Sequence, residues 1–337
     1  MYLDEPLHTL DIIIDEDNDR AVLRANKTEL LCRGTKEYIL SQRSEILTNR
    51  GYVVPEDWDY NWNVHLGPIW SPAASEDITQ SNIVAWVLPE YFVADSSDAT
   101  KITKAADRAG SNDFLADVTS SKWPSFSTVK LNNHYGIEFD GTDDYLQCQN
   151  QTMWGLGTGD FLFACVVTSQ TDQNARMWIA SYGEDDNTSS DDEPHWGLAF
   201  NTQASNTAVQ HWIDETKHAI GSIWDTDPHI LLSSRTSLTG DIRHRGASIG
   251  TKTMSGSIIN PSGSNRGMQL ASIDQNTGGE YKFLDGVIYE AIWIDTTVST
   301  AVQQKIEGYL AHKYALTADL PSDHPYKTNP PRQSVAS

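Results

Sequence analysis

The stretch Gly136-Ile-Glu-Phe-Asp-Gly-Thr-Asp-Asp-Tyr-Leu146 has the form strand, turn, strand. Its Asp140-Gly141 pair is typical of a tight turn. Outward from it, short apolar runs alternate with polar turns, at 83–88, 136–139, 161–167, 177–180, 197–200, 209–213, 230–233, 268–273 and 282–294. This series predicts a mainly β protein, an antiparallel two-sheet sandwich or jelly roll rather than a βαβ fold.

One strong helix is predicted after the last of these runs. Ser299 can cap it, and Val302, Ile306, Tyr309 and Leu310 recur at three- and four-residue spacing on one face. We expect this C-terminal helix to pack on an edge or a face of the sandwich.

The first eighty residues differ from the rest. Residues 9–14 and 20–24 are strand candidates separated by an acidic turn, which suggests a hairpin. Residues 35–48 have the apolar pattern of a one-face helix. We therefore expect a small α+β anchoring region at 1–80, the sandwich at 81–326 and a short tail at 327–337.

An irregular stretch rich in aromatic and proline residues, 54–72, ends this region. Large rings in a loop need cover, so the stretch is expected either to dock on a partner or to fold back as an intramolecular flap. The candidate docking residues are Trp58, Tyr60, Trp62 and Trp70.

Two stretches carry a family resemblance. Gly136–Leu146 resembles the "FDG-DDYL" segment of concanavalin-A-like (laminin-G-like) domains, which implies that the flanking aromatic and leucine side chains enter the core. Asp285-Gly-Val-Ile-Tyr-Glu-Ala-Ile-Trp-Ile294, followed by Ile306-Glu-Gly-Tyr-Leu-Ala-His-Lys-Tyr314 and Leu320-Pro-Ser-Asp-His-Pro-Tyr326, looks like the final strand, helix and "EGYLAHKYGL…LPxxHPY" ending of such domains. The resemblance implies a jelly roll used for carbohydrate or protein binding in bacterial and bacteriophage proteins.

Ala315 departs from this pattern, because the family often has glycine there. We expect the departure to cost little, since glycine at that position merely eases helix termination. His312 and His324 are interpreted as packing residues around the last helix rather than as ligands, and Cys148 and Cys165 as small buried apolar residues.

The charge excludes some classes of partner. Forty-six acidic residues against twenty-four Lys and Arg give a formal net charge of -22, which repels phosphate backbones and anionic lipids. Nucleic acid is therefore an unfavourable partner. The N-terminus lacks the pattern of a signal peptide and no run of about eighteen apolar residues occurs, so we expect neither secretion by that route nor membrane insertion.

The leading hypothesis is a non-enzymatic structural protein of a bacteriophage virion, made in the host cytoplasm. It would decorate the capsid or form part of a tail or fibre, with other virion proteins as partners and many copies or a homo-oligomer. Three features support this hypothesis: the missing secretion signal, the aromatic and proline-rich stretch at 54–72, and a sandwich of the kind used for binding.

The alternative hypothesis is a carbohydrate-binding adhesin or lectin module for host-surface glycans. An indole ring matches the apolar face of a pyranose, so Trp196 and Trp212, with Asp214 beside the latter, are the candidate ligand-binding residues. Core packing is the competing interpretation for every tryptophan of a sandwich.

A glycoside hydrolase is less favoured, and no catalytic residue is assigned. Retaining enzymes on this fold use a Glu-x-Asp-x-x-Glu segment, which does not occur; Glu184 and Glu193 would be the residues to test. Calcium is a further option, because hard oxygen ligands suit it. The candidate calcium ligands are Asp185, Asp186, Asp191 and Asp192; the competing interpretation is a solvated acidic loop without a metal ion. Asp140, Asp143 and Asp144 are an alternative set, although the Asp140-Gly141 pair is already explained by the turn.

Overall fold

The computed structural model describes residues 10–15, 20–25, 29–34, 70–72, 77–170, 175–185, 196–202, 208–213, 216–221, 223, 225–259, 267–275 and 280–331. The chain divides into two compact units, one comprising Met1–Ile69 with Arg332–Ser337 and the other Trp70–Pro331. The sequence placed this boundary near residue 80. The difference arises because Trp70 and Ile78 pack into the sandwich unit.

The first unit contains a three-stranded antiparallel sheet of β1 (Leu10–Asp15), β2 (Arg20–Ala25) and β3 (Glu29–Gly34). Strands β1 and β2 pair from Leu10 with Ala25 to Asp15 with Arg20, so the predicted hairpin is confirmed. Strand β3 was not predicted. The helix expected at 35–48 lies outside the described residues.

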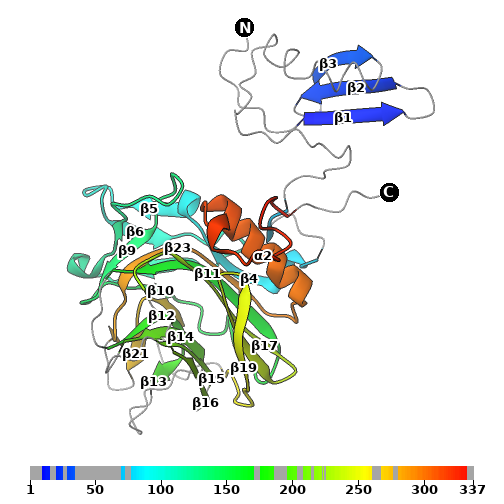
Figure 1. Cartoon of the computed structure of the whole chain (residues 1–337). Coiled ribbons are helices and arrows are strands. Elements are labelled where there is room, and N and C mark those ends of the chain that lie inside the picture. Colours follow the sequence, from blue (N-terminus) through cyan, green and yellow to red (C-terminus); the bar gives the residue numbers. More distant parts are fainter. Residues whose placement is uncertain are drawn as a thin grey trace. The chain divides into compact units, whose positions relative to one another are not determined.

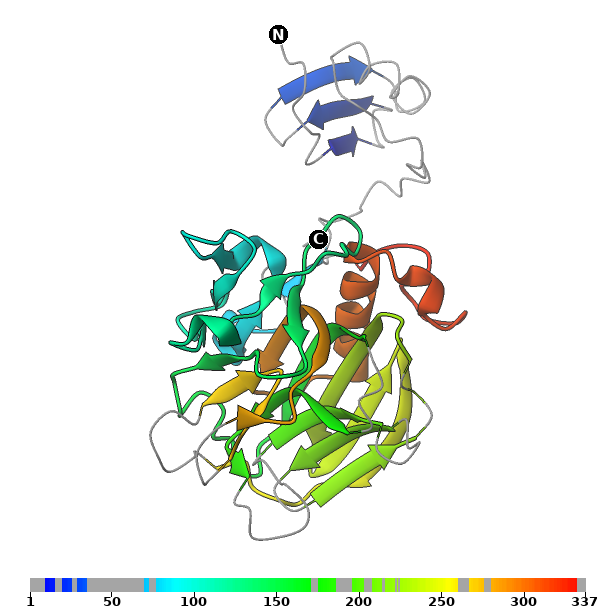
Figure 2. The ribbon, with the colours of Figure 1, turned by 90° about the vertical axis from the view of Figure 1, so that its left-hand side faces the viewer.

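The second unit is built on two large antiparallel sheets (Figures 1 and 2). In spatial order, the first contains β16 (Thr216–Ile220), β15 (Ala208–Ile213), β14 (Trp196–Asn201), β12 (Arg176–Tyr182), β20 (Met268–Leu270), β10 (Leu146–Cys148), β7 (Phe114–Ala116), β6 (Ile102–Ala105) and β5 (Phe92–Ala94). The second contains β19 (Ala247–Thr253), β18 (Thr239–His244), β17 (His229–Thr236), β11 (Phe161–Ser169), β23 (Asp285–Ile294), β9 (Ile137–Asp140) and β8 (Ser125–Phe126), with β4 (Ile83–Val87) also paired to β23. The predicted mainly β, two-sheet sandwich is confirmed.

Smaller elements complete the unit. A short sheet joins β13 (Glu184–Asp185), β21 (Ile273–Gln275) and β22 (Glu280–Tyr281). Single 3-10 turns occur at η2 (Gln80–Asn82), η3 (Pro89–Tyr91), η4 (Ser120–Lys122) and η6 (Thr317–Asp319).

The Asp140-Gly141 turn carries the chain from one sheet to the other rather than forming a hairpin, because β9 and β10 belong to different sheets. Gly141 has φ 71°, a conformation that glycine adopts without strain. The Asp140 carboxylate accepts the backbone N–H of Thr142 at 2.8 Å. Phe139 and Leu146, on either side of the turn, are fully buried, as the sequence predicted.

Strands β11 and β23 are apolar along most of their length because both of their faces are covered. On β11, Phe161, Phe163 and Cys165 face the core between the sheets. Leu162 and Val166 belong to a second apolar layer on the opposite face of the same sheet. Complete burial of such side chains stabilises a fold by about 1.5–3 kcal/mol each, so two-sided cover makes these strands the centre of the structure.

Helix α2 (Thr300–Lys313) covers that second apolar layer (Figure 1). The Ser299 side chain accepts the N–H of Val302 as predicted, and Val302, Ile306 and Leu310 are buried. The described part of the chain contains no helix long and apolar enough to cross a membrane.

A buried carboxylate on β23, Glu290, ties this helix to the sheet. It is fully buried and accepts hydrogen bonds from Trp86 Nε1 at 2.7 Å, Lys313 Nζ at 2.8 Å, Tyr314 OH at 2.9 Å and Tyr309 OH at 3.1 Å. Burial and the adjacent Glu290 charge raise the pKa of both tyrosines well above the usual value, so both remain protonated donors.

A second buried carboxylate, Glu307 on α2, meets Arg243 of β18 in a two-pronged ion pair with distances of 2.7 and 3.0 Å. His324 Nε2 lies 3.2 Å from the same carboxylate. His312 Nε2 lies 2.9 Å from the carbonyl oxygen of Tyr326, so both histidines serve the packing role that the sequence predicted. The "EGYLAHKY…HPY" residues are therefore the parts of a helix anchor.

We expect Glu307→Gln to lower the free energy of unfolding by about 3–5 kcal/mol, because it leaves the Arg243 guanidinium buried without its charge partner. Urea unfolding would measure the loss. Lys104→Met is the matched control: it breaks a half-exposed pair with Asp113 and should cost less than about 1 kcal/mol. Equal losses in the two variants would contradict the anchoring role of Glu307.

Ala315 corrects one expectation from the sequence. Its φ is 57°, in the left-handed region, and the N–H of Leu316 bonds back to the carbonyl of Ala311 at 2.7 Å, which closes a Schellman-type helix end. Alanine in this conformation is strained by about 1–2 kcal/mol. Alanine at this position therefore lowers stability by more than the small cost that the sequence suggested.

Ala315→Gly should raise the free energy of unfolding by up to about 1 kcal/mol, because relief of strain exceeds the added entropy of the unfolded chain. Ala318→Gly, in the neighbouring η6, has no left-handed backbone to relieve and should be neutral or destabilising. Chemical unfolding of the two variants in parallel checks the difference, and a destabilised Ala315→Gly protein would refute the explanation.

Candidate functional site

A groove of about 1330 Å³ opens beside β8, β9 and the first residue of β23. Its walls come from segments far apart in the sequence. The lining residues are Ala94, Ala99, Thr100, Lys101, Ser125, Phe126, Ser127, Thr128, Lys130, Tyr135, Glu138, Phe139, Asp140, Asp144, Gln170 and Asp285. Clefts that combine an aromatic wall with converging polar groups are a common form of ligand site.

Strand register places two carboxylates of the groove on one face of the sheet. Asp140 of β9 lies directly opposite Asp285 of β23, and residues opposite each other in an antiparallel pair project to the same side. Gln170, which directly follows the end of β11, donates its backbone N–H to the carbonyl of Asp285 at 2.9 Å. The sheet thus presents a row of acceptor groups to the groove.

Glu138, two residues before Asp140, is held in a fixed orientation. One of its carboxylate oxygens accepts the Gln170 side-chain amide at 3.0 Å, and the other accepts the N–H of Thr128 at 2.9 Å. Fixed acceptors of this kind can receive hydrogen bonds from a ligand without losing further side-chain entropy.

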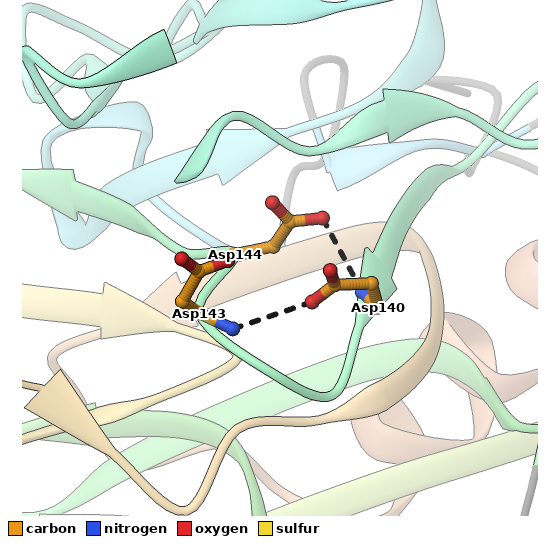
Figure 3. A group of neighbouring side chains, drawn as sticks. All are labelled: Asp140, Asp143 and Asp144. Atoms are coloured by element: carbon orange, nitrogen blue, oxygen red, sulfur yellow. Dashed lines mark hydrogen bonds between the residues drawn. The ribbon is translucent and has the colours of Figure 1, made fainter. Parts of the chain in front are cut away.

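Asp144 is the buried acid of the site. Figure 3 shows it beside Asp140 and Asp143, and the carboxylate oxygens of the three residues come within 4.8 Å of one another. Asp144 is 3% exposed; its Oδ2 accepts the N–H of Asp140 at 3.3 Å, and its Oδ1 is buried with no hydrogen-bond partner. Burial, with the nearby Asp140 charge, raises the pKa of Asp144 to about 7.

These three aspartates also form a candidate metal site. Among the described residues they form the one group with metal-ligand spacing. Calcium takes about six to eight oxygen ligands, whereas Asp140 Oδ1 already accepts the N–H of Thr142, and burial raises the pKa of Asp144 to about 7, which weakens it as an anionic ligand at neutral pH. The three side chains therefore do not complete a calcium shell by themselves.

The calcium candidates favoured by the sequence cannot be compared with this cluster. Only the backbone of Asp185, in β13, belongs to the described part of the chain. Asp186, Asp191 and Asp192 lie outside it, so that site stays a prediction. The structure instead brings together the alternative trio, which the sequence had explained by the turn alone.

Tyr135 supplies the exposed ring of the groove. It is 42% exposed, packs edge-on against Phe126 with ring centroids 5.8 Å apart, and has Lys130 Nζ 4.0 Å above its ring centroid. Sequence reasoning missed this ring because no pattern marks Tyr135 as facing the same space as Glu138 and Asp140.

The structure corrects the choice of tryptophans as sugar-binding residues. Trp196 is fully buried, with its ring centroid 5.1 Å from that of Phe163, in the core between the sheets. Trp212 is 1% exposed and lies beneath the Arg176 guanidinium at 4.7 Å. Neither ring has a free face for a pyranose, so both pack the interior. Asp214 lies outside the described residues.

Trp70 was predicted to dock on a virion partner, and the structure corrects that assignment as well. Its ring is fully buried against Tyr309 of α2, its Nε1 donates to Asp77 at 3.1 Å, and its N–H bonds to the carbonyl of Pro331 at 2.8 Å. Trp70 therefore packs within its own chain, which was the alternative expectation for this stretch. Trp58, Tyr60 and Trp62 lie outside the described residues.

Comparison with known proteins defines the fold only coarsely. No family model matches the chain, and no curated protein matches it. Similar solved structures include a Trypanosoma rangeli sialidase in complex with the inhibitor DANA, at 10% identity and TM-score 0.45 over 84% of this chain and 41% of that one. An arabinofuranosidase complexed with arabinofuranosyl-alpha-1,2-xylobiose has 11% identity and TM-score 0.48 over 64% and 51%. The binding domain of botulinum neurotoxin DC in complex with SialylT has 8% identity and TM-score 0.44 over 68% and 52%.

The chain spans about half the length of these proteins, and at such identities the similarity concerns the fold alone. It nevertheless contradicts one prediction. The sequence analysis concluded that the chain is not an enzyme, yet the sialidase and the arabinofuranosidase are glycoside hydrolases.

The raised pKa of Asp144 predicts a pH dependence of stability. The unfolded chain releases this proton near pKa 3.8 and the folded chain near 7, so the stabilising contribution is complete below about pH 3.8 and is lost as the pH rises through 7. Asp144→Asn removes the titration. It should lessen the loss of stability between pH 5 and pH 8 by on the order of 2 kcal/mol.

Urea unfolding at the two pH values measures this effect. Asp323→Asn, which changes an exposed aspartate away from the groove, is the control and should leave the pH difference as in the parent protein. An Asp144→Asn protein with an unchanged pH difference would show that Asp144 is ionised at neutral pH.

Proposed function

We propose that the sandwich binds glycans and that the groove beside β8 and β9 is the binding site. One observation supports the proposal: an exposed aromatic ring and fixed carboxylate and amide groups line the same groove. Sugar hydroxyls donate to such acceptors, and the apolar C–H face of a pyranose covers an aromatic ring. The groove volume of about 1330 Å³ is large enough for more than a single monosaccharide.

The proposal shifts the site away from the tryptophans. Its residues are Tyr135 for the ring contact and Glu138, Asp140, Gln170 and Asp285 for hydrogen bonding. Lys130 covers one face of the Tyr135 ring, so a sugar would use the remaining exposed part of the ring or displace this exposed lysine.

The bacteriophage virion remains a prediction from the sequence. Neither the described structure nor the compared proteins bear on a capsid, a tail or a cellular location. Glycan binding is compatible with a host-recognition role on a virion, and multiple copies would strengthen weak single-site contacts there.

Binding of the full chain to a panel of oligosaccharides tests the proposal. We expect Tyr135→Ala and Glu138→Gln each to weaken binding about tenfold, the effect of losing one ring contact or one charged hydrogen bond. Tyr91→Ala is the matched control, because Tyr91 is similarly exposed (39%) but does not line the groove.

The affinities can be measured by titration calorimetry, with circular dichroism to confirm that each variant is folded. The Tyr91→Ala protein should bind as the parent does. Absence of binding to every glycan at millimolar concentration, or equal weakening by the Tyr91 and Tyr135 variants, would rule out this groove as the site.

A further inference from the structure

The two large sheets meet along one side at a seam between their outermost strands, β16 and β19. Strand β16 is at one end of the first sheet, and β19 is at one end of the second. Lys252 Nζ of β19 donates to the carbonyl oxygen of Lys217 in β16 at 2.6 Å. A Cβ on Gly250 of β19 would lie 2.6 Å from Ile220 Cδ1, so glycine permits this close approach. The hairpin of β15 and β16 therefore closes one side of the sandwich.

Two histidines of this hairpin face the interior between the sheets. His211 of β15 lies directly opposite His218 of β16, so both side chains project to the same side. The His211 ring lies edge-on to Phe161 of β11, with centroids 5.9 Å apart, and a Cβ on Gly240 of β18 would lie 3.5 Å from its Cε1. A Cβ on Gly250 of β19 would lie 3.4 Å from His218 Nε2. Strands of the second sheet therefore pack against both histidines.

His211 is enclosed without a group that could stabilise a proton on its ring. The ring is fully buried, and neither of its nitrogens has a hydrogen-bond partner in the described part of the chain. Among the described residues, the charges that act on it come from Arg235 of β17 and from His218, and Lys252 acts in turn on His218. Burial, with these positive neighbours, lowers the pKa of His211 to about 3 and also lowers that of His218.

The strands that face the hairpin are fixed by contacts that the hairpin lacks. The buried Arg235 guanidinium donates to the carbonyl oxygens of Gly157 and Gly159 at 2.7–3.0 Å, so it cannot turn away from His211. Strand β18 is tied from its other face to α2 by the ion pair of Arg243 with Glu307. Among the described strands, β16 pairs within its sheet with β15 alone. If the seam separates, the hairpin moves while β17 and β18 stay in place.

A histidine that must be neutral in the closed form couples closure to pH. When the hairpin is detached, the ring is hydrated and takes up a proton near pH 6.5, whereas the closed form takes one up only at a much lower pH. The closed form is therefore fully favoured above about pH 6.5. Below it, each such ring favours detachment by up to about tenfold per pH unit.

We propose that the hairpin of β15 and β16 is an acid-sensitive switch, closed over the interior while His211 and His218 are neutral and detached from β18 and β19 in acid. The inference does not depend on the proposed function, because β16 and β19 lie at the opposite end of the strand order from β8 and β9, which border the groove.

Hydrogen exchange of the full chain, read by mass spectrometry and corrected for the intrinsic pH dependence of exchange, tests the proposal at about pH 7.5 and about pH 5. Peptides covering Ala208–Ile213 and Thr216–Ile220 should lose protection by about thirtyfold or more at the lower pH. At that pH they should also exchange at least about tenfold faster than peptides of β11 and β23, because the opening is local.

His211→Met removes the titration without removing a hydrogen bond, since neither ring nitrogen has a described partner. Its loss of protection between the two pH values should be at least about tenfold smaller than that of the parent. His134→Gln is the matched control, because His134 is paired with Glu90 away from the seam, and it should show the loss of the parent. His218→Gln, at a less enclosed position, is the second variant if circular dichroism shows that His211→Met does not fold; its loss should be at least about threefold smaller.

Unchanged protection of the hairpin in the parent protein at the two pH values would overturn the proposal without any variant. Equal protection of the hairpin and of β11 and β23 at about pH 5 would also overturn it, because the chain would then open only as a whole. A histidine variant at 211 or 218 that folds and keeps the full loss of protection would show that other groups govern the hairpin.

Discussion

The buried carboxylate of Glu290 is the constraint from which the arrangement of the sandwich unit follows. An ionised carboxylate taken out of water costs several kcal/mol unless hydrogen bonds and opposite charge replace its hydration. Here Trp86 from β4 and Tyr309, Lys313 and Tyr314 from α2 and its end supply those groups. The helix is thereby held in one position on the sheet, which apolar contacts alone would specify less sharply.

Strand β23 connects this anchor to the groove. In its middle it carries Glu290 into the layer beneath α2, where four protein donors bind the carboxylate. At its start it carries Asp285 into the groove, opposite Asp140. Carboxylates of one strand thus serve two purposes: Glu290 anchors the helix, and Asp285 lines the groove proposed to bind glycans.

Much of the fold was predictable because long, fully buried strands leave an unambiguous pattern. The runs at 161–167 and 282–294 became β11 and β23, and Ser299 caps α2 as expected. Strands such as β5, β7 and β8 escaped prediction because two or three residues carry no periodicity. The strain at Ala315 also escaped it, since a left-handed residue is apparent only from its backbone angles.

The sequence by itself determined the mainly β class, the strong C-terminal helix and the acidic character of the protein, because these depend on local pattern and on composition. Only the tertiary structure decided which side chains meet. Trp196 and Trp212 turned inward, while Tyr135, Glu138, Asp140 and Asp285 came to share one groove. The physical reason is that strand register and sheet order, which arise from contacts between distant segments, set the face on which each side chain lies.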